Sequence, residues 1–208
     1  MILLMKEMLQ MSLLTKKMIT ETALKLAEKK SINKITVNEL SGQCGISRNT
    51  FYYHFHDIYD VFLSFIDNRI DEMVANADKN AEDAMLDFIE TCVRYKYMFQ
   101  NLYKSLGHEL TSKFAHEKLE RLLLSALEKN YDTESICEDD LDIIFTFYEE
   151  AIIGVMIRWL RDQTPDDPTQ RADQLNRIKI LFCGQIDLMI HNSLNANETY
   201  HKNIDSDE

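Results

Sequence analysis

A short segment, residues 47–55, holds the side chains whose types and spacing could do chemistry. Ser47 can cap the N-terminus of a short helix on which Phe51 and Phe55, four residues apart, share the inward face. The outward face then carries groups that donate and accept hydrogen bonds, on Arg48, Asn49, Tyr52 and Tyr53. Large outward aromatic side chains are otherwise difficult to explain on so short a helix. On a projecting helix these groups could reach base edges in the major groove of DNA.

A second short helix is predicted directly before this one. Thr36 and Glu39 have the spacing of a capping box, and Gly45 can adopt the positive φ that ends a helix in a tight turn. A helix-turn-helix requires two short helices that cross over a turn of about three to four residues. The segment from residue 36 to residue 55 meets that requirement.

Longer helices are predicted on both sides of this pair. Residues 16–30 have the apolar spacing of an amphipathic helix, and Asp57 can cap a fourth helix that connects to the rest of the chain. Further helices are predicted near residues 81–97, 102–104, 111–130, 139–162 and 170–194. The last two should form an antiparallel pair across the proline-containing residues 164–168. With only 5 Gly and 2 Pro in 208 residues, the fold is predicted to be all-α.

Four regions are predicted along the chain. Residues 14–60 form a helix-turn-helix domain, and residues 61–195 form a helical dimerisation and regulatory domain. Residues 1–13 are an N-terminal extension, and residues 196–208 are a polar tail that frays.

Composition and charge limit the possible functions. The net charge is -12, but residues 1–63 contain 8 Lys and Arg against 6 Asp and Glu, so the acidic excess lies in the remainder. This asymmetry favours DNA binding by a face of the N-terminal part, with the acidic remainder of the chain held away from the DNA. No export signal or membrane span is evident, and the four separated cysteines have the pattern of reduced, buried thiols, so we expect a cytoplasmic protein. We find no nucleophile with its base, phosphate loop or metal-ligand cluster, so we expect neither an enzyme nor a cofactor or metal site.

The segment from residue 36 to residue 55, TVNELSGQCGISRNTFYYHF, resembles the signature of TetR-type repressors, and the likeness covers about residues 14–65. Residues 147–160 also resemble the C-terminal domain of a TetR subgroup that includes dihydroxyacetone-kinase regulators. Some members of that subgroup act as coactivators with a protein partner.

The resemblance implies roles for individual residues. It implies base contacts by Arg48 and Asn49, since Arg suits guanine edges and Asn suits adenine, with Thr50 as a further contact. It implies backbone positioning by Lys34, Thr36, Tyr52, Tyr53 and His54, and Ser47 is a further predicted DNA-binding residue. One departure is Ile58, since the family commonly has a phosphate-binding Lys there; His56 could replace it in part. An aromatic cluster on a module that no longer binds DNA is the alternative interpretation of Tyr52, Tyr53 and His54.

The longer C-terminal part is predicted to dimerise and to sense a signal. One helix-turn-helix domain contacts one half-site of an operator, so useful affinity requires a second copy of the chain. The interface between the two copies is predicted at Ile153, Gly154, Ile157, Ile180, Gly184 and Leu188. A close contact within one subunit would explain Gly154 and Gly184 equally well. A cavity for a small-molecule effector is predicted at Tyr95, Phe99, Tyr103, Phe114, Phe147, Tyr148 and Trp159, although ordinary core packing explains the same aromatic residues.

The sequence therefore predicts a homodimeric regulator that binds a double-stranded DNA operator. We expect a repressor whose operator affinity is changed by a small-molecule effector or a protein partner. The alternative is a TetR-like coactivator or protein-interaction module with weak or lost DNA binding.

Overall fold

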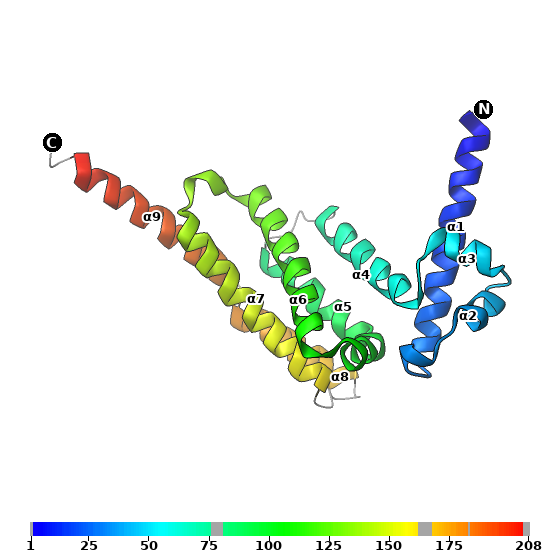
Figure 1. Ribbon diagram of the computed structural model, residues 1–208. Coiled ribbons are helices and arrows are strands. Elements are labelled where there is room, and N and C mark those ends of the chain that lie inside the picture. Colours follow the sequence, from blue (N-terminus) through cyan, green and yellow to red (C-terminus); the bar gives the residue numbers. More distant parts are fainter. Residues whose placement is uncertain (1, 76–80, 162–167, 183, 206–208) are drawn as a thin grey trace. The chain divides into compact units, whose positions relative to one another are not determined.

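The computed structural model describes residues 2–75, 81–161, 168–182 and 184–205, and all regular structure in these ranges is helical (Figure 1). The predicted all-α fold is therefore confirmed. The elements are α1 (Ile2–Ala27), the 3-10 helix η1 (Ile32–Lys34), α2 (Val37–Gln43), α3 (Arg48–His54), α4 (Ile58–Ala75), α5 (Ala81–Arg94), α6 (Lys96–Asn130), the 3-10 helix η2 (Thr133–Ser135), α7 (Glu138–Arg161), α8 (Pro168–Phe182) and α9 (Gln185–Asp205).

The helices form two compact units. The first unit contains residues 1–69 and 95–108, and the second contains residues 70–94 and 109–208. The boundary within α6 lies beside Gly107, whose φ of 80° interrupts the helix. This interruption agrees with the prediction of separate helical segments before and after residues 105–110.

The first unit has a core built from α1 to α4. Ile19 and Ala23 of α1, Leu40 of α2 and Phe62 of α4 are fully buried there. The beginning of α6 joins the same unit, because the side-chain amide of Asn101 donates a hydrogen bond of 2.9 Å to the Ala27 carbonyl. These contacts fix the end of α1, from which the chain continues into the helix-turn-helix.

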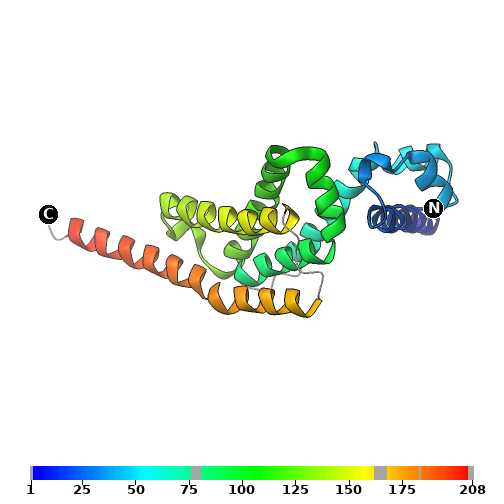
Figure 2. The same cartoon turned by 90° about the horizontal axis from the view of Figure 1, so that it is seen from below.

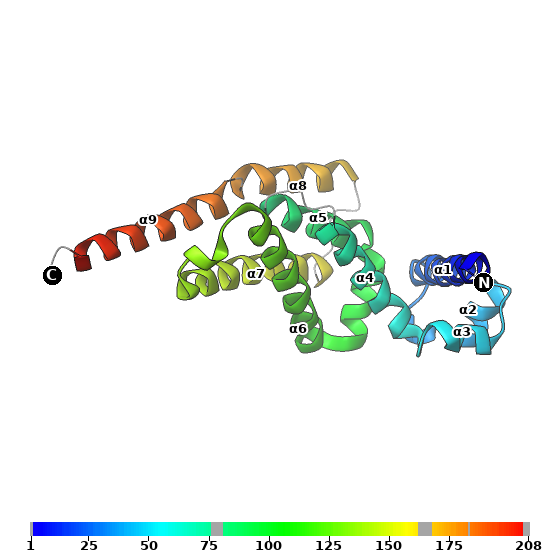
Figure 3. The ribbon, with the colours of Figure 1, turned by 90° about the horizontal axis from the view of Figure 1, so that it is seen from above.

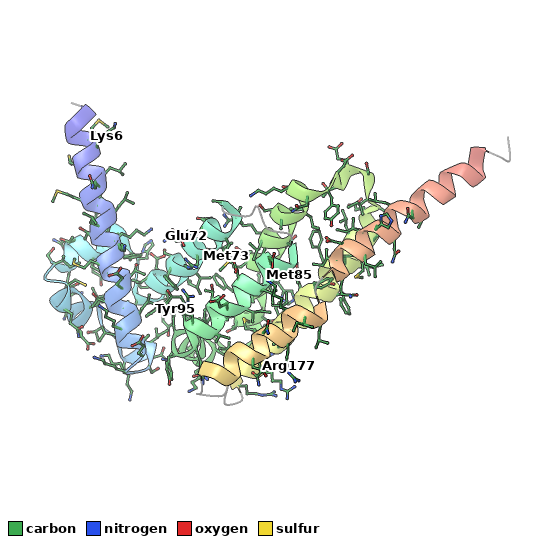
Figure 4. The ribbon with its side chains drawn as sticks, turned by 180° about the vertical axis from the view of Figure 1, so that it is seen from behind. Lys6, Glu72, Met73, Met85, Tyr95 and Arg177 are labelled. Carbon is green, nitrogen blue, oxygen red and sulfur yellow. The ribbon has the colours of Figure 1, made fainter. Side chains whose placement is uncertain are left out.

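The first helix starts much earlier than residue 16, where the amphipathic pattern begins. It begins at Ile2, since no Gly or Pro interrupts the preceding residues, and its first turns carry Lys6 (Figure 4). Several large apolar side chains of these turns are 59–69% exposed: Met5, Met8, Leu9, Met11, Leu13 and Leu14.

The second unit is built around α5 and α7. Helix α5 packs against α8 on one side and against α7 on another (Figure 3), while the end of α4 contributes the buried Met73 and α5 contributes the buried Met85 (Figure 4). Helix α7 packs against α9 and runs antiparallel to it, which confirms the predicted pairing for α9, whereas α8 packs against α5 (Figure 1). Residues 164–167 of the predicted proline-containing break lie outside the described residues.

The prediction of one helix over residues 170–194 is wrong. Helix α8 ends at Phe182, α9 begins at Gln185, and Gly184 between them has a φ of 78° (Figure 2). Glycine adopts this left-handed conformation without the steric cost that a Cβ would bring. Gly184 therefore ends a helix rather than providing a close-packing position inside one. Helix α9 also continues to Asp205, so residues 196–205 are helical rather than a frayed tail.

Candidate nucleic-acid interface

Helix α2 begins and ends as its sequence predicts. The Thr36 hydroxyl caps the helix by accepting a hydrogen bond of 3.2 Å from the Glu39 backbone N–H, while the Glu39 carboxylate accepts one from the Lys30 ammonium group. At the other end the Ile46 N–H donates to the Ser41 carbonyl at 3.0 Å around Gly45, whose φ is 65°. This is the Schellman arrangement in which a glycine reverses the chain after a helix.

Helix α3 is fixed by one cap and two buried rings. The Ser47 hydroxyl accepts a hydrogen bond of 3.0 Å from the Thr50 N–H and lies 2.9 Å from the Thr50 hydroxyl. Phe51 and Phe55 are 0% and 2% exposed, so the inward face predicted for this helix is confirmed.

The opposite face of α3 is open. Arg48 and Asn49 are exposed, and Tyr52 and Tyr53 are 49% and 78% exposed. The Arg48 guanidinium lies 5.9 Å from the Tyr52 ring centroid, a distance at which a cation–π interaction can stabilise the orientation of the Arg48 side chain. This face therefore presents a guanidinium, an amide and two phenol groups from one short helix.

The remaining predicted contact residues lie in the same unit. Lys34 ends η1 and Thr36 caps α2, and both side chains are exposed. Ser47 is exposed, whereas Thr50 and His54 are half-buried on α3. The nine predicted contact residues thus belong to one compact unit: Lys34 ends η1, Thr36 and Ser47 are helix caps, and the other six lie on α3.

Ile58 lies in the core of the first unit. It is the first residue of α4 and only 8% exposed. The carboxylate of Asp57 accepts a hydrogen bond of 2.9 Å from the Asp60 N–H, which confirms Asp57 as the cap. The Asp60 carboxylate accepts one of 2.7 Å from the His56 N–H. The start of α4 therefore offers an apolar core residue and two carboxylates.

Lys16 of α1 is a basic residue beside α3 that the sequence reasoning missed. Its Nζ lies 5.4 Å from the Phe55 ring centroid. Burial and then the charge of Lys16 lower the pKa of His54 below its usual value of 6.5. No local sequence pattern connects Lys16 with His54, since only the packing of the first unit brings them together.

The residues predicted for an effector cavity are divided between the two units. In the first unit Phe99 is buried, and Tyr95 and Tyr103 are half-buried. The Tyr95 ring packs edge-on against the Phe65 ring, with 4.7 Å between the ring centroids. In the second unit Tyr148 is buried and Phe114 half-buried, while Phe147 is 55% exposed. The side chain of Trp159 lies outside the described part. These residues therefore do not gather within a single unit.

The residues predicted for the dimer interface differ in their exposure. Ile153 and Ile157 of α7 are 2% and 8% exposed, so both side chains already pack inside the second unit. Ile180 of α8 and Leu188 of α9 are 68% and 53% exposed, as is the neighbouring Leu181 at 70%, which the sequence reasoning missed. Among the described residues, nothing lies within 4 Å of a Cβ added to Gly154, which is itself exposed.

None of the described helices combines the length and apolar character needed to cross a membrane. Among the same residues, no three His, Cys, Asp or Glu side chains are placed to hold a metal ion.

Two family models match the chain. The model for bacterial regulatory proteins of the tetR family matches residues 19–65, and a model for a transcriptional regulator C-terminal region matches residues 79–179. The search of curated proteins found no match. The two matched regions contain the helix-turn-helix and most of the helices of the second unit.

Solved structures share the fold. The dihydroxyacetone kinase operon activator DhaS has a TM-score of 0.65 at 15% identity, over 87% of this chain and 98% of its own. A TetR transcriptional regulator from Rhodococcus sp. RHA1 has a TM-score of 0.52 at 16% identity, over 86% and 97%. A tetR-family regulator from Streptomyces coelicolor has a TM-score of 0.51 at 13% identity, over 87% and 88%.

The helix-turn-helix, the helical C-terminal region and these matches agree with one another and with the resemblance seen in the sequence. Regulators of this kind bind DNA and are not enzymes. The chain belongs to the TetR family of transcriptional regulators.

Proposed function

We propose that the chain is a homodimeric regulator that binds an operator through the outward face of α3. The observation that carries this proposal is that Arg48, Asn49, Tyr52 and Tyr53 are exposed on a helix anchored by buried Phe51 and Phe55. An anchored helix keeps its outward groups at fixed positions, which is what recognition of a base edge requires. Helix packing inside the protein would bury such aromatic side chains instead.

Different residues have different tasks in this proposal. Arg48 and Asn49, at the start of α3, contact base edges, because a guanidinium suits guanine and an amide suits adenine. Thr50 adds a further contact. The groups that hold the backbone are contributed by Lys34, Thr36, Ser47, Tyr52, Tyr53 and His54. These contacts fix the register of the protein on DNA without reading sequence.

The test uses a duplex selected from a random library by the wild-type protein. We expect Arg48→Ala to weaken binding to this duplex by about 1 to 3 kcal/mol and to relax the preference at one base position. Arg94→Ala, which removes an exposed arginine paired with Glu90 on α5, should leave the isotherm unchanged. Fluorescence anisotropy at fixed salt measures both variants. An Arg48→Ala isotherm that matches the wild type would contradict the assignment.

Dimerisation is proposed through the exposed apolar side chains of α8 and α9. Ile180, Leu181 and Leu188 are 53–70% exposed, and a second copy would bury them. Gly154 would allow a close approach of the partner to α7, since none of the described residues fills the space beside it.

Analytical ultracentrifugation tests this interface. We expect Leu181→Glu to shift the protein from dimer to monomer, because the interface would have to bury a carboxylate. Leu110→Glu changes a leucine of α6 that is 57% exposed and should leave the dimer intact. A dimer that survives Leu181→Glu and Leu188→Glu together would show that the interface lies elsewhere.

The direction of regulation depends on whether the bound dimer blocks or assists transcription from the promoter. We propose a repressor whose operator affinity changes when a small-molecule effector or a protein partner favours one conformation of the dimer. The name of DhaS, an operon activator, favours a second candidate, an activator. A reporter gene behind the selected operator distinguishes the two, since deletion of the regulator raises expression for a repressor and lowers it for an activator.

A further inference from the structure

The C-terminal end of α3 has no cation of its own. Residues 55–60, FHDIYD, contain no Lys or Arg, and Ile58 among them is buried. His56 lies between Asp57 and Asp60, and its backbone N–H is bound by the Asp60 carboxylate. These carboxylates repel a phosphate, so the loop after α3 cannot hold the DNA backbone by itself.

Lys16 brings a positive charge to this end of α3 from a different helix. Its ammonium group lies 5.4 Å from the centroid of the Phe55 ring, which is itself 2% exposed and therefore fixed in position. The attraction between a cation and an aromatic ring restricts where the half-buried Lys16 side chain can point. Figure 1 shows α1 beside α3 within the first unit.

The charge of Lys16 is not neutralised by an ion pair within the described part of the chain. Lys17 lies 3.9 Å from the Glu21 carboxylate, and Lys30 forms an ion pair with Glu39. Lys16, by contrast, forms no ion pair with any carboxylate of the described residues. A restrained and uncompensated ammonium group next to a proposed DNA-binding face is suited to a phosphate.

His54 gives this position a second polar group. Its ring packs edge-on against the exposed Tyr53 ring, with 5.0 Å between centroids. Burial and the neighbouring Lys16 lower the pKa of His54, which favours the neutral imidazole, and a neutral imidazole can donate one hydrogen bond. A phosphate beside both groups would receive a charge from Lys16 and a hydrogen bond from His54.

We propose that Lys16 binds a DNA phosphate at the C-terminal end of α3, together with His54. The proposal rests on the DNA binding proposed above and adds to it a backbone contact from α1. It divides the contacts so that the N-terminal end of α3 reads bases and the C-terminal end is held on the backbone by a cation from another helix.

The salt dependence of DNA binding tests this contact. We compare the wild type with Lys16→Met, which keeps an unbranched side chain against Phe55, and with Lys17→Met as the matched control on the same helix. Losing one phosphate contact makes the slope of log K against log salt shallower by about 0.9 for duplex DNA. Between 50 and 200 mM salt, Lys16→Met should therefore lose about three- to fourfold less affinity than the wild type.

Each result of this comparison has a defined meaning. The inference is supported if Lys16→Met has the shallower slope on both selected and random duplexes, Lys16→Arg restores it, and Lys17→Met keeps the wild-type slope. It is overturned if Lys16→Met and Lys17→Met have the same slope, or if Lys16→Met changes preference at one base position only. A wild-type protein that does not bind duplex DNA at low salt would instead refute the proposed function. Circular dichroism of each variant confirms that it is folded.

Discussion

Phe51 of α3 and Phe55, the residue that caps its C-terminal end, have ring centroids 6.0 Å apart, and they anchor the helix whose opposite face carries Tyr53. We expect Phe51→Ala to lower the free energy of unfolding by about 3 to 5 kcal/mol, because the ring is fully buried. Tyr53→Ala, at a position that is 78% exposed, should change it by less than about 0.5 kcal/mol while weakening DNA binding. Urea denaturation followed by circular dichroism measures both, and equal losses of stability would contradict the orientation of α3.

Gly42 and Gly45 form a matched pair three residues apart. Nothing lies within 4 Å of a Cβ added at either position, but Gly45 has a φ of 65° whereas Gly42 lies in α2. We expect Gly45→Ala to destabilise the protein by about 1 to 2 kcal/mol through backbone strain alone. Gly42→Ala should stabilise it by about 0.5 to 1 kcal/mol, since alanine restricts the unfolded chain. Thermal melts of the two variants should shift in opposite directions, and shifts of the same sign would show that the turn does not require a left-handed residue.

Ile58→Lys would restore a basic residue at the start of α4, but the structure changes what this variant tests. Because Ile58 is 8% exposed, we expect the lysine to lower the free energy of unfolding by about 1 to 3 kcal/mol. Ile58→Val, which keeps an apolar side chain, should cost about 0.5 to 1.5 kcal/mol. Chemical denaturation distinguishes the two. A fully stable Ile58→Lys protein would mean that the side chain at this position reaches solvent.

His116 of α6 joins two helices through a hydrogen-bonded imidazole. One ring nitrogen lies 2.8 Å from the Ser112 carbonyl oxygen, and the other lies 3.1 Å from the Glu150 carboxylate of α7. Burial alone would lower the pKa of His116, but these two hydrogen bonds and the charges of Glu150 and Glu149 outweigh it and raise the pKa above 6.5. The folded protein therefore binds this proton more tightly than the unfolded chain does.

The sign of the pH dependence follows from this shift. The contribution of His116 to stability is fully present below pH 6.5 and is lost as the pH rises through the folded-state pKa. We expect His116→Gln to lower the free energy of unfolding at pH 6 by no more than about 0.5 kcal/mol, because the pair is partly exposed, and to have less effect at pH 8. Urea titrations at both pH values measure it, and a larger effect at pH 8 would contradict the assignment.

His54 should show the opposite pH dependence of stability to His116. Burial and the charge of Lys16 lower its pKa, so its contribution to stability is present above pH 6.5 and is lost as the pH falls through the lowered pKa. His54→Gln should therefore lose less stability than the wild type between pH 7 and pH 5.

The parts of the molecule that local sequence determines were predictable. The caps at Thr36, Ser47 and Asp57 and the turn at Gly45 each depend on residues no more than five positions apart. The inward and outward faces of α3 follow from helical periodicity in the same way. These features include every predicted contact residue except Lys34, although their contacts with DNA remain a prediction.

Features that depend on distant packing were not predictable. Lys16 lies 38 positions before His54 in sequence, so no spacing rule could bring it to α3. The burial of Ile153 and Ile157 depends on which face of α7 meets the other helices of the second unit. Gly184 lies in an apolar stretch in which periodicity alone continues the helix, and only its φ of 78° shows the break. In each case the local sequence pattern was compatible with more than one arrangement, and only the folded structure shows which one is present.

The ion pairs that Lys17 and Lys30 form with Glu21 and Glu39 affect how the protein would search a genome. A lysine beside a carboxylate releases fewer counterions on meeting DNA, so random sequence is held weakly. A genome presents about 10⁶ to 10⁹ competing sites, and weak retention on them leaves more molecules free to find the operator.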